Sequence, residues 1–291
     1  MRVLVTGSRG LIGAALVTRL TADGHEVHTT GRRPSDLTHH HLADLAVPAQ
    51  ARDAITAAKP EVVVHLAGGA APTRHELYRS NVLTTVALVE AAAGTAVPPH
   101  VVVVGSAAEY GEGDGEPLTE TAQLRPVTEY GRAKVAATTL AEVVAGERSL
   151  SLAVARPFNV VSGGLPASTV LGNLRRQLLD QGGARRVVRC GRVDVVRDFV
   201  PLDFVTLALA TLAVGRHRGT YNLCSGVGIR LDAILTAMGE QLGIELVLEP
   251  QPELLALPAA DHVVGSAERF RSLGLTVSPT PAELARLCLA A

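Results

Sequence analysis

The chain has 291 residues, of which 47% are hydrophobic and 19% are charged. Its 27 basic and 28 acidic side chains give a formal net charge of −1, which argues against a disordered chain and against general attraction to nucleic acid or anionic membrane. The three cysteines are dispersed and form no CxxC pair, which predicts a reduced protein without a metal site. The sequence shows no signal-peptide pattern and no run near the roughly 18 apolar residues of a membrane span. We therefore expect a soluble, cytoplasmic protein.

Through the first half of the chain, β-branched runs alternate with Ala- and Leu-rich segments. We expect strands at Arg2–Thr6, His25–Thr29, Val62–Leu66, Val101–Val104 and Leu152–Ala155, and helices at Leu11–Ala22, Pro48–Ala58, Asn81–Ala93 and Glu129–Ala145. Two of these strands are apolar throughout, as in a parallel sheet that is covered on both faces. The alternation predicts βαβ units and a doubly wound, Rossmann-type parallel sheet of the α/β class.

The pattern changes after about residue 160. A glycine-rich loop is followed by expected helices at Val170–Asp180 and Leu202–Val214, a basic stretch at Arg185–Arg197, a strand at Thr220–Leu223 and a final helix near Pro281–Leu289. We therefore expect a first domain over residues 1–160 and a smaller lobe over residues 161–291, with residues 203–224 returning to the first domain.

The segment between the first strand and the first helix is Gly7-Ser-Arg-Gly-Leu-Ile-Gly13. Gly7 permits a tight turn, Gly10 lets backbone N–H groups approach a pyrophosphate, and Gly13 lets the helix pack closely on the strand. A glycine pattern alone often marks only a turn. Its place directly before a helix N-terminus, which favours negative charge, predicts dinucleotide binding by Gly7, Arg9, Gly10, Leu11, Ile12 and Gly13.

The end of the second strand indicates which dinucleotide is bound. NAD sites usually carry Asp or Glu there, whereas this chain has Arg32 and Arg33 and no acid until Asp36. Guanidinium groups bind phosphate in a planar, bidentate manner, so Arg32 and Arg33 suit a 2′-phosphate on the adenosine ribose. Arg9 could add a third guanidinium group. The alternative is a solvated basic turn. The residues favour NADP(H) over NAD(H).

The run His39–His41 raises the question of a metal site. Three adjacent residues of regular structure cannot all face one ion, and no acidic partners are evident, so we expect a solvated loop and no metal. Asp44 and Leu45 follow the expected third strand and are placed to border the adenine.

Tyr130 and Lys134 are four residues apart in an expected helix, which puts both side chains on one face. A neighbouring ammonium lowers the pKa of a phenol and prepares it for proton transfer. Ser106 follows an apolar strand, at the sheet edge where such folds place their chemistry. A surface Tyr and Lys is the alternative, but Lys134 is one of only two lysines beside 25 arginines.

Seven motifs occur in order: GSRGLIG (7–13), HLAG (65–68), VVVVGSAAEYG (101–111), YGRAK (130–134), RPFN (156–159), RDF (197–199) and YNLCSG (221–226). Together, over about residues 1–235, they resemble the extended short-chain dehydrogenase/reductase family of nucleotide-sugar epimerases, dehydratases and ketoreductases. Within this family, the chain is most similar to the branch of the GDP-4-keto-6-deoxyhexose reductases. The similarity lies in GSAAEYG and in the span from RDF to YNLCSG.

The resemblance implies roles for particular residues. Ser106, Tyr130 and Lys134 would be catalytic, with Tyr130 giving a proton to the carbonyl oxygen and Lys134 also binding the nicotinamide ribose. Further cofactor contacts would come from Asp44, Leu45, Leu66, Ala67, Pro157 and Phe158, and substrate contacts from Ser106, Asn159 and Arg197. For Arg197 the alternatives are a solvated charge or a salt bridge with Asp198.

Two alanines narrow the reaction that the resemblance implies. Family dehydratases carry acids at the positions of Ala107 and Ala108, and the epimerising reductases place a Cys at the position of Ala108. Among the activities of the family, an NADPH-dependent reductase of a nucleotide-linked 4-keto-6-deoxyhexose remains as the expected function. An NAD-dependent nucleotide-sugar 4-epimerase and a non-catalytic dinucleotide-binding regulator are the alternatives. Family members usually dimerise through two helices, here Asn81–Ala93 and Glu129–Ala145, so a homodimer is expected.

Overall fold

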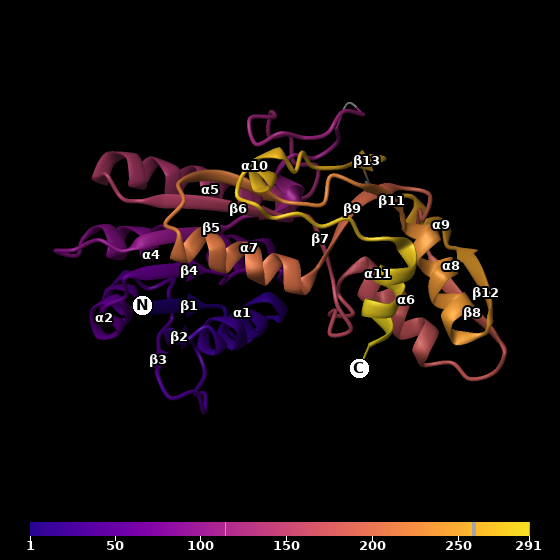
Figure 1. Cartoon of the computed structure of the whole chain (residues 1–291), viewed down its shortest axis with the longest axis horizontal. Coiled ribbons are helices and arrows are strands. Elements are labelled where there is room, and N and C mark those ends of the chain that lie inside the picture. Colours follow the sequence, from indigo (N-terminus) through magenta and orange to yellow (C-terminus); the bar gives the residue numbers. More distant parts are fainter. Residues whose placement is uncertain (114, 258–259, 291) are drawn as a thin grey trace.

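A seven-stranded parallel sheet organises the computed structural model, which describes residues 1–113, 115–257 and 260–290. The strands lie in the order β10-β6-β5-β4-β1-β2-β3 (Figure 1). Their bounds are β1 Arg2–Thr6, β2 Glu26–Gly31, β3 His40–Leu42, β4 Val62–His65, β5 His100–Val104, β6 Leu152–Pro157 and β10 Gly219–Leu223. The strand order reverses between β1 and β4, and ligands of such sheets bind at the crevice beside that reversal.

Helices cover both faces of the sheet, which explains why β4 and β5 are buried along their whole length. Helices α1 (Leu11–Ala22) and α7 (Leu202–Val214) pack on one face, in front of the sheet in Figure 1. Helices α2 (Pro48–Ala58), α4 (Thr84–Ala93) and α5 (Glu129–Arg148) pack on the other. The predicted doubly wound α/β fold is confirmed.

The start of α4 differs from the expected helix at Asn81. A short helix, α3 (Arg74–Tyr78), and one π-helical turn, η1 (Arg79–Leu83), precede α4. The buried Asn81 amide donates to the carbonyls of Leu77 and Gly69 and accepts from the Gly69 N–H. The Asn81 side chain thus competes with the backbone for hydrogen bonds of the helix. We attribute the π-helical turn, where the helix meets the loop after β4, to this competition.

The expectation of a solvated loop at His39–His41 is wrong, because His40 and His41 belong to β3. This strand pairs with β2 in parallel at the edge of the sheet. The His40 ring is hydrogen-bonded on both sides, with Nδ1 2.9 Å from Thr29 Oγ1 and Nε2 2.9 Å from the Arg33 carbonyl. The His40 imidazole therefore hydrogen-bonds to strand β2 and to the segment after it. The polarity of the histidine run had suggested a solvated loop instead.

The rest of the chain builds a C-terminal lobe on the side of the sheet where β7 leaves β6 (Figure 1). A two-stranded parallel sheet of β8 (Arg185–Cys190) and β12 (Glu245–Pro250) packs with α6 (Val170–Leu179), α8 (Leu231–Leu242) and α11 (Pro281–Leu289). Strands β7 (Asn159–Val161), β11 (Gly228–Arg230) and β13 (His262–Val263) all pair with β9 (Val196–Pro201). The short helices are η2 (Ala107–Glu109), α9 (Pro252–Leu255) and α10 (Glu268–Arg271).

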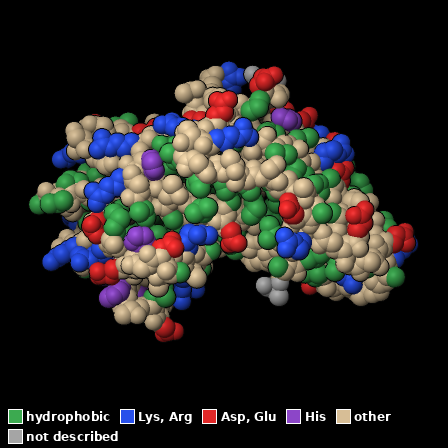
Figure 2. Space-filling view, viewed as in Figure 1, with side chains coloured by type: hydrophobic (Ala, Val, Ile, Leu, Met, Phe, Trp, Pro, Cys, Tyr) green, Lys and Arg blue, Asp and Glu red, His purple; other side chains and the backbone are tan. Residues whose placement is uncertain are grey.

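The basic stretch Arg185–Arg197 is largely neutralised by acids of its own lobe. Across the β8–β12 pair, Arg185 faces Glu245 at 3.4 Å and Arg189 faces Glu249 at 3.3 Å. These exposed pairs belong to the outer surface, and only Arg197 of the stretch faces the catalytic candidates. Figure 2 shows basic and acidic side chains interspersed over the visible face. Within the described ranges, every helix is too short or too polar to cross a bilayer.

Candidate active site

The glycine loop lies against the ends of β1 and β4. Gly7 has φ +66°, and a Cβ on it would come within 2.7 Å of the Leu66 carbonyl group. A Cβ on Gly13 would lie only 2.2 Å from the Gly7 oxygen. Side chains at these two positions would therefore push α1 away from the sheet. The loop leaves the N-terminus of α1 open to a ligand at the crevice.

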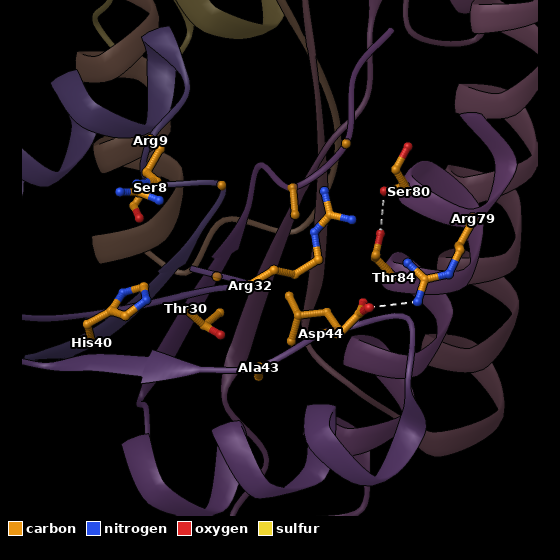
Figure 3. Close-up of a pocket in the computed structure, with 15 residues that line it drawn as sticks. Ser8, Arg9, Thr30, Arg32, His40, Ala43, Asp44, Arg79, Ser80 and Thr84 are labelled. Atoms are coloured by element: carbon orange, nitrogen blue, oxygen red, sulfur yellow. Dashed lines mark hydrogen bonds and ion pairs between the residues drawn. The ribbon is translucent and has the colours of Figure 1, made fainter. Parts of the chain in front are cut away.

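A first cavity extends from this loop over the ends of β2 and β3 (Figure 3). Arg32 extends from the end of β2 into its middle, and Arg9 lies at its rim. Of the residues expected around the dinucleotide, those lining this cavity are Gly7, Arg9, Arg32, Asp44, Leu45 and Ala67. Arg33 does not line it; the Arg33 side chain is exposed, and its backbone carbonyl lies 2.9 Å from His40 Nε2.

Several residues of this cavity were not found from the sequence, among them Arg79, His40 and Thr30. Arg79 donates to Asp44 Oδ2 at 2.6 Å (Figure 3). Burial opposes ionisation of Asp44, but hydrogen bonds from Arg79 and the Ala46 N–H hold its pKa below the usual value. His40 and Thr30 also line the wall. Arg79 is separated from Asp44 by 35 residues and carries no local motif, so only the fold could bring them together.

The polar atoms of this cavity fit a nucleoside. Thr30 Oγ1 is buried and has no hydrogen-bond partner among the described residues, which is rare in folded proteins and points to a polar partner absent from the chain itself. The cations Arg9, Arg32 and Arg79 surround the same space. The Thr30 hydroxyl could hydrogen-bond to a ribose hydroxyl, and the guanidinium groups could bind a phosphate.

A second cavity shares Gly7 with the first and leads toward the end of β5. It brings together residues from six segments of the chain. The expected residues that line it are Gly7, Gly10, Leu11, Ile12, Gly13, Leu66, Ser106, Tyr130, Lys134, Pro157 and Phe158. The arrangement provides a continuous path from the glycine loop to the three catalytic candidates.

Helix α5 presents Tyr130 and Lys134 to this cavity. Thr128 caps the helix by accepting from the Gly131 N–H at 3.0 Å. A Cβ on Gly131 would lie 2.3 Å from the Ala108 oxygen, so glycine lets the helix approach η2. Lys134 Nζ donates to the Val104 carbonyl at 2.9 Å and lies 5.9 Å from the centre of the Tyr130 ring. Burial lowers the pKa of Lys134 to about 8.

The expected lowering of the Tyr130 pKa is wrong for this structure. Burial raises the pKa of Tyr130 to about 12, with an opposing contribution from the hydrogen bond to the Ser106 side chain. The Lys134 ammonium does not offset this, because it donates to a backbone carbonyl instead of to the phenol oxygen. Tyr130 therefore keeps its proton at neutral pH, as a proton donor must.

Ser106 is held by a buried carboxylate that the sequence analysis missed. Its N–H donates to Glu109 Oε1 at 2.8 Å, and its Oγ accepts from the Ala108 N–H at 3.2 Å. Glu109 Oε2 also accepts from Arg156 Nε at 2.9 Å and Thr138 Oγ1 at 3.0 Å, all in the interior. The Ser-x-x-Glu spacing of a capping box was the available sequence signal.

A third cavity opens on the other side of Ser106 and Tyr130, toward the C-terminal lobe. Ala107, Ala108, Asn159 and Arg197 line it. Asn159 Nδ2 donates to the Asp198 carbonyl at 2.8 Å, and Arg197 donates to the backbone oxygens of Val196 and Asp261 at 2.9 and 3.3 Å. Burial lowers the pKa of the Arg197 guanidinium.

Arg197 does not form the salt bridge with Asp198 that the sequence left open. The Asp198 carboxylate accepts from the Ser225 N–H and Oγ, the Gly226 N–H and the Gly265 N–H. It thus joins β9 to the segments after β10 and β13. Within the described residues no acidic side chain is paired with Arg197, which leaves its charge available to the cavity.

The fold is that of a doubly wound α/β protein with three connected cavities along the ends of its parallel strands. Residues 3–224 match the model of the NAD dependent epimerase/dehydratase family, and the chain belongs to that family.

Known proteins are similar over nearly the whole chain. The dTDP-6-deoxy-L-talose 4-dehydrogenase (NAD(P)(+)) of Kitasatospora kifunensis is 29% identical over 95% of this chain and 88% of its own length. The GDP-6-deoxy-D-mannose reductase of Pseudomonas aeruginosa is 27% identical over 92% of this chain and 89% of its own. The Thermus thermophilus UDP-glucose 4-epimerase, solved with NAD, superposes with TM-score 0.86 at 25% identity, covering 99% of this chain and 98% of that one.

Proposed function

We propose that this protein is an NADPH-dependent reductase of a nucleotide-linked 4-keto-6-deoxyhexose. The observation that carries the proposal is the position of Ser106, Tyr130 and Lys134 where the dinucleotide path meets a cavity containing Arg197. Ala107 and Ala108 stand in that cavity and cannot transfer protons. The names of two relatives, a 6-deoxytalose dehydrogenase and a 6-deoxymannose reductase, describe redox chemistry on 6-deoxyhexose nucleotides and support it.

The dinucleotide would lie along the first two cavities. The glycine loop and the N-terminus of α1 would hold the pyrophosphate, while Asp44, Leu45, Leu66, Ala67, Pro157 and Phe158 would line the cofactor. Arg9 and Arg32 would bind the 2′-phosphate, which favours NADP(H) over NAD(H). Lys134 would bind the nicotinamide ribose. When bound, NADPH supplies the hydride.

The chain itself supplies the proton. The Tyr130 hydroxyl would donate it to the carbonyl oxygen, so that hydride and proton together convert the ketone to an alcohol. Ser106 would donate a hydrogen bond to the same oxygen and stabilise the negative charge that develops there. Burial raises the pKa of Tyr130 to about 12, so the phenol carries its proton at neutral pH and can act as the donor.

The substrate would approach from the third cavity. Arg197 and Asn159 would contact the diphosphate, and residues 161–291, apart from the returning segment 203–224, would form the substrate lobe. The strand β10 of that segment lies beside β6 in the main sheet. We further propose a cytoplasmic homodimer without nucleic-acid or membrane partners.

The direct experiment follows NADPH absorbance with freshly generated 4-keto-6-deoxyhexoses linked to GDP, dTDP or UDP. One of these should consume NADPH, and Tyr130→Phe should slow that reaction at least about 100-fold while NADPH binding is retained. Tyr78→Phe is the matched control, because Tyr78 lies outside the three cavities. Full activity of Tyr130→Phe, or tight NADPH binding with no turnover of any keto sugar, would contradict the proposal.

An NAD-dependent 4-epimerase is the second candidate. The superposition on an NAD-bound epimerase favours it. This function predicts that NAD co-purifies with the protein and that a nucleotide hexose is isomerised without net consumption of coenzyme. Tighter binding of NADPH than of NADH by the purified protein would argue against it.

A further inference from the structure

A group of histidines lies at the edge of the main sheet, on the face of β2 that does not contact α1. Glu26 and His28 are two residues apart on β2 and so point to the same face. The register Thr29↔His40 and Thr30↔His41 places His39 beside His28 on the adjoining segment. Figure 2 shows His side chains at the surface in the region where β3 lies in Figure 1.

The potential ligand atoms of Glu26, His28 and His39 all lie within 4.8 Å of one another. His28 Nε2 is 2.9 Å from Glu26 Oε1, and the His28 and His39 rings are stacked with centroids 4.6 Å apart. Ligand atoms around a tetrahedral zinc ion are roughly 3.3 Å apart. A side-chain movement of about 1.5 Å or less would bring these atoms to the separations of a three-residue site. The sequence analysis did not expect such a site because it lacked the β2–β3 pairing.

We propose that Glu26, His28 and His39 bind a divalent transition-metal ion, with zinc as the best match. Two imidazole nitrogens and one carboxylate oxygen are a ligand set that zinc commonly takes, with water in the fourth position. Glu26 Oε2 makes no hydrogen bond to any described residue and is free to coordinate, whereas Oε1 accepts from Arg2 Nε at 3.2 Å. His39 is exposed, and a turn of its ring aims a nitrogen at the ion.

A neighbouring histidine provides the outer support of such a site. His28 Nδ1 lies 2.9 Å from His41 Nε2, so the second nitrogen of the buried His28 ring is already engaged. Histidine ligands of metals characteristically hold their other ring nitrogen in a hydrogen bond, which sets the tautomer and the ring orientation. His41 is therefore a positioning residue that directs His28 Nε2 toward the ion.

The ion would join β2 to the start of β3. The segment between them, residues 32–38, carries Arg32, which lines the first cavity. Because the metal would tie together both ends of this segment, binding should raise the melting temperature of the protein. This inference does not depend on the proposed reductase activity, and its test measures metal binding alone.

The experiment uses the full chain without an affinity tag, stripped with a chelator and titrated with Zn²⁺ against a chromophoric chelator. We expect one Zn²⁺ per chain. His39→Ala and Glu26→Gln, both at exposed positions, should each weaken binding at least tenfold and abolish the rise in melting temperature; His41→Ala should weaken it about tenfold or more. His75→Ala removes an exposed histidine elsewhere and should bind as the parent does.

Cobalt provides an independent readout, because a three-residue site gives Co²⁺ a visible absorption band that His39→Ala should remove. Equal Zn²⁺ affinity of the parent and His39→Ala would overturn the proposal, as would a parent chain that fails to compete with the chelator. Loss of binding in His75→Ala as well would show diffuse surface binding and would overturn it too.

Discussion

At the scale of single residues, the environment of a side chain decides its role more than its motif does. Among the described residues, two capping boxes, Ser106–Glu109 and Thr280–Glu283, share one local hydrogen bond, from the backbone N–H of the first residue to the Glu carboxylate. Glu283 is exposed, whereas Glu109 is fully buried and also pairs with Arg156. The same sequence pattern therefore caps a surface helix in one case and holds a catalytic candidate in the other.

This contrast gives the first prediction. Glu109→Gln leaves the Arg156 charge buried without its partner and should cost about 3 kcal/mol or more in the free energy of unfolding. Glu283→Gln perturbs only an exposed cap and should cost less than about 1 kcal/mol. Urea unfolding of both variants measures the difference. Equal losses would show that Glu109 acts only as a cap.

The Lys134 pKa of about 8 predicts how activity depends on pH. Below pH 8 the ammonium is present and can hold the nicotinamide ribose; above pH 8 it loses its proton. The kcat/KM for NADPH should therefore be constant near pH 7 and fall as the pH rises through about 8. In Lys134→Arg the guanidinium stays charged, so this falling limb should disappear whatever the absolute rate. A parent profile that stays flat to pH 9.5 would contradict the assignment.

At the scale of elements, the close approach of helices to the sheet edge builds the site. Gly13 lets α1 meet the glycine loop, and Gly131 lets α5 meet η2. Gly146, near the end of α5, has nothing within 4 Å of a Cβ added to it. Glycine in these helices thus has a packing reason at the first two positions and none at the third.

Alanine substitution should separate these cases. Gly13→Ala places a Cβ 2.2 Å from the Gly7 oxygen, so α1 must shift, and we expect NADPH affinity to fall at least tenfold. Gly146→Ala meets no atom and should stabilise the protein by up to about 1 kcal/mol through helix propensity. Fluorescence titration of NADPH and thermal unfolding measure the two effects. Unchanged NADPH affinity in Gly13→Ala would contradict this account of the loop.

At the scale of the whole molecule, apolar side chains remain exposed on α5 and η1. Leu140 and Val143 on α5 are 41% and 49% exposed, and Leu83 on the adjoining η1 is 51% exposed. Burial of such side chains against a second copy would remove them from water. The surface suits the homodimer that we propose.

Sedimentation velocity tests that interface. A Leu140→Glu/Val143→Glu variant should shift the protein from dimer to monomer, because it would bury two unpaired carboxylates between the copies. Val97→Glu is the matched control: Val97 is 85% exposed but lies in the loop before β5, outside the proposed interface. A parent chain that sediments as a monomer would refute the dimer, and a dimeric double variant would place the interface elsewhere.

Much of the fold could be predicted because its signals are local. The bounds of α1, α2, α7 and α11 agree with the sequence prediction, since the hydrophobic period, the glycine loop and the prolines at the starts of α2 and α11 mark them. The sequence did not predict that His40 and His41 belong to the third strand, nor that the start of α4 is irregular. The polar side chains of these two segments hydrogen-bond to partners on other elements, which no local pattern reveals.

The sequence by itself determined the alternation of strands and helices, the glycine turn before α1 and the spacing of Tyr130 and Lys134, because each depends on residues within a few positions of one another. Only the tertiary structure decided the electrostatics. The raised Tyr130 pKa, the burial of Glu109 with Arg156, the pairing of Arg79 with Asp44 and the histidine cluster arise from groups on different segments that only the fold brings together. Burial and charge contacts act through space, and the packed fold sets those distances.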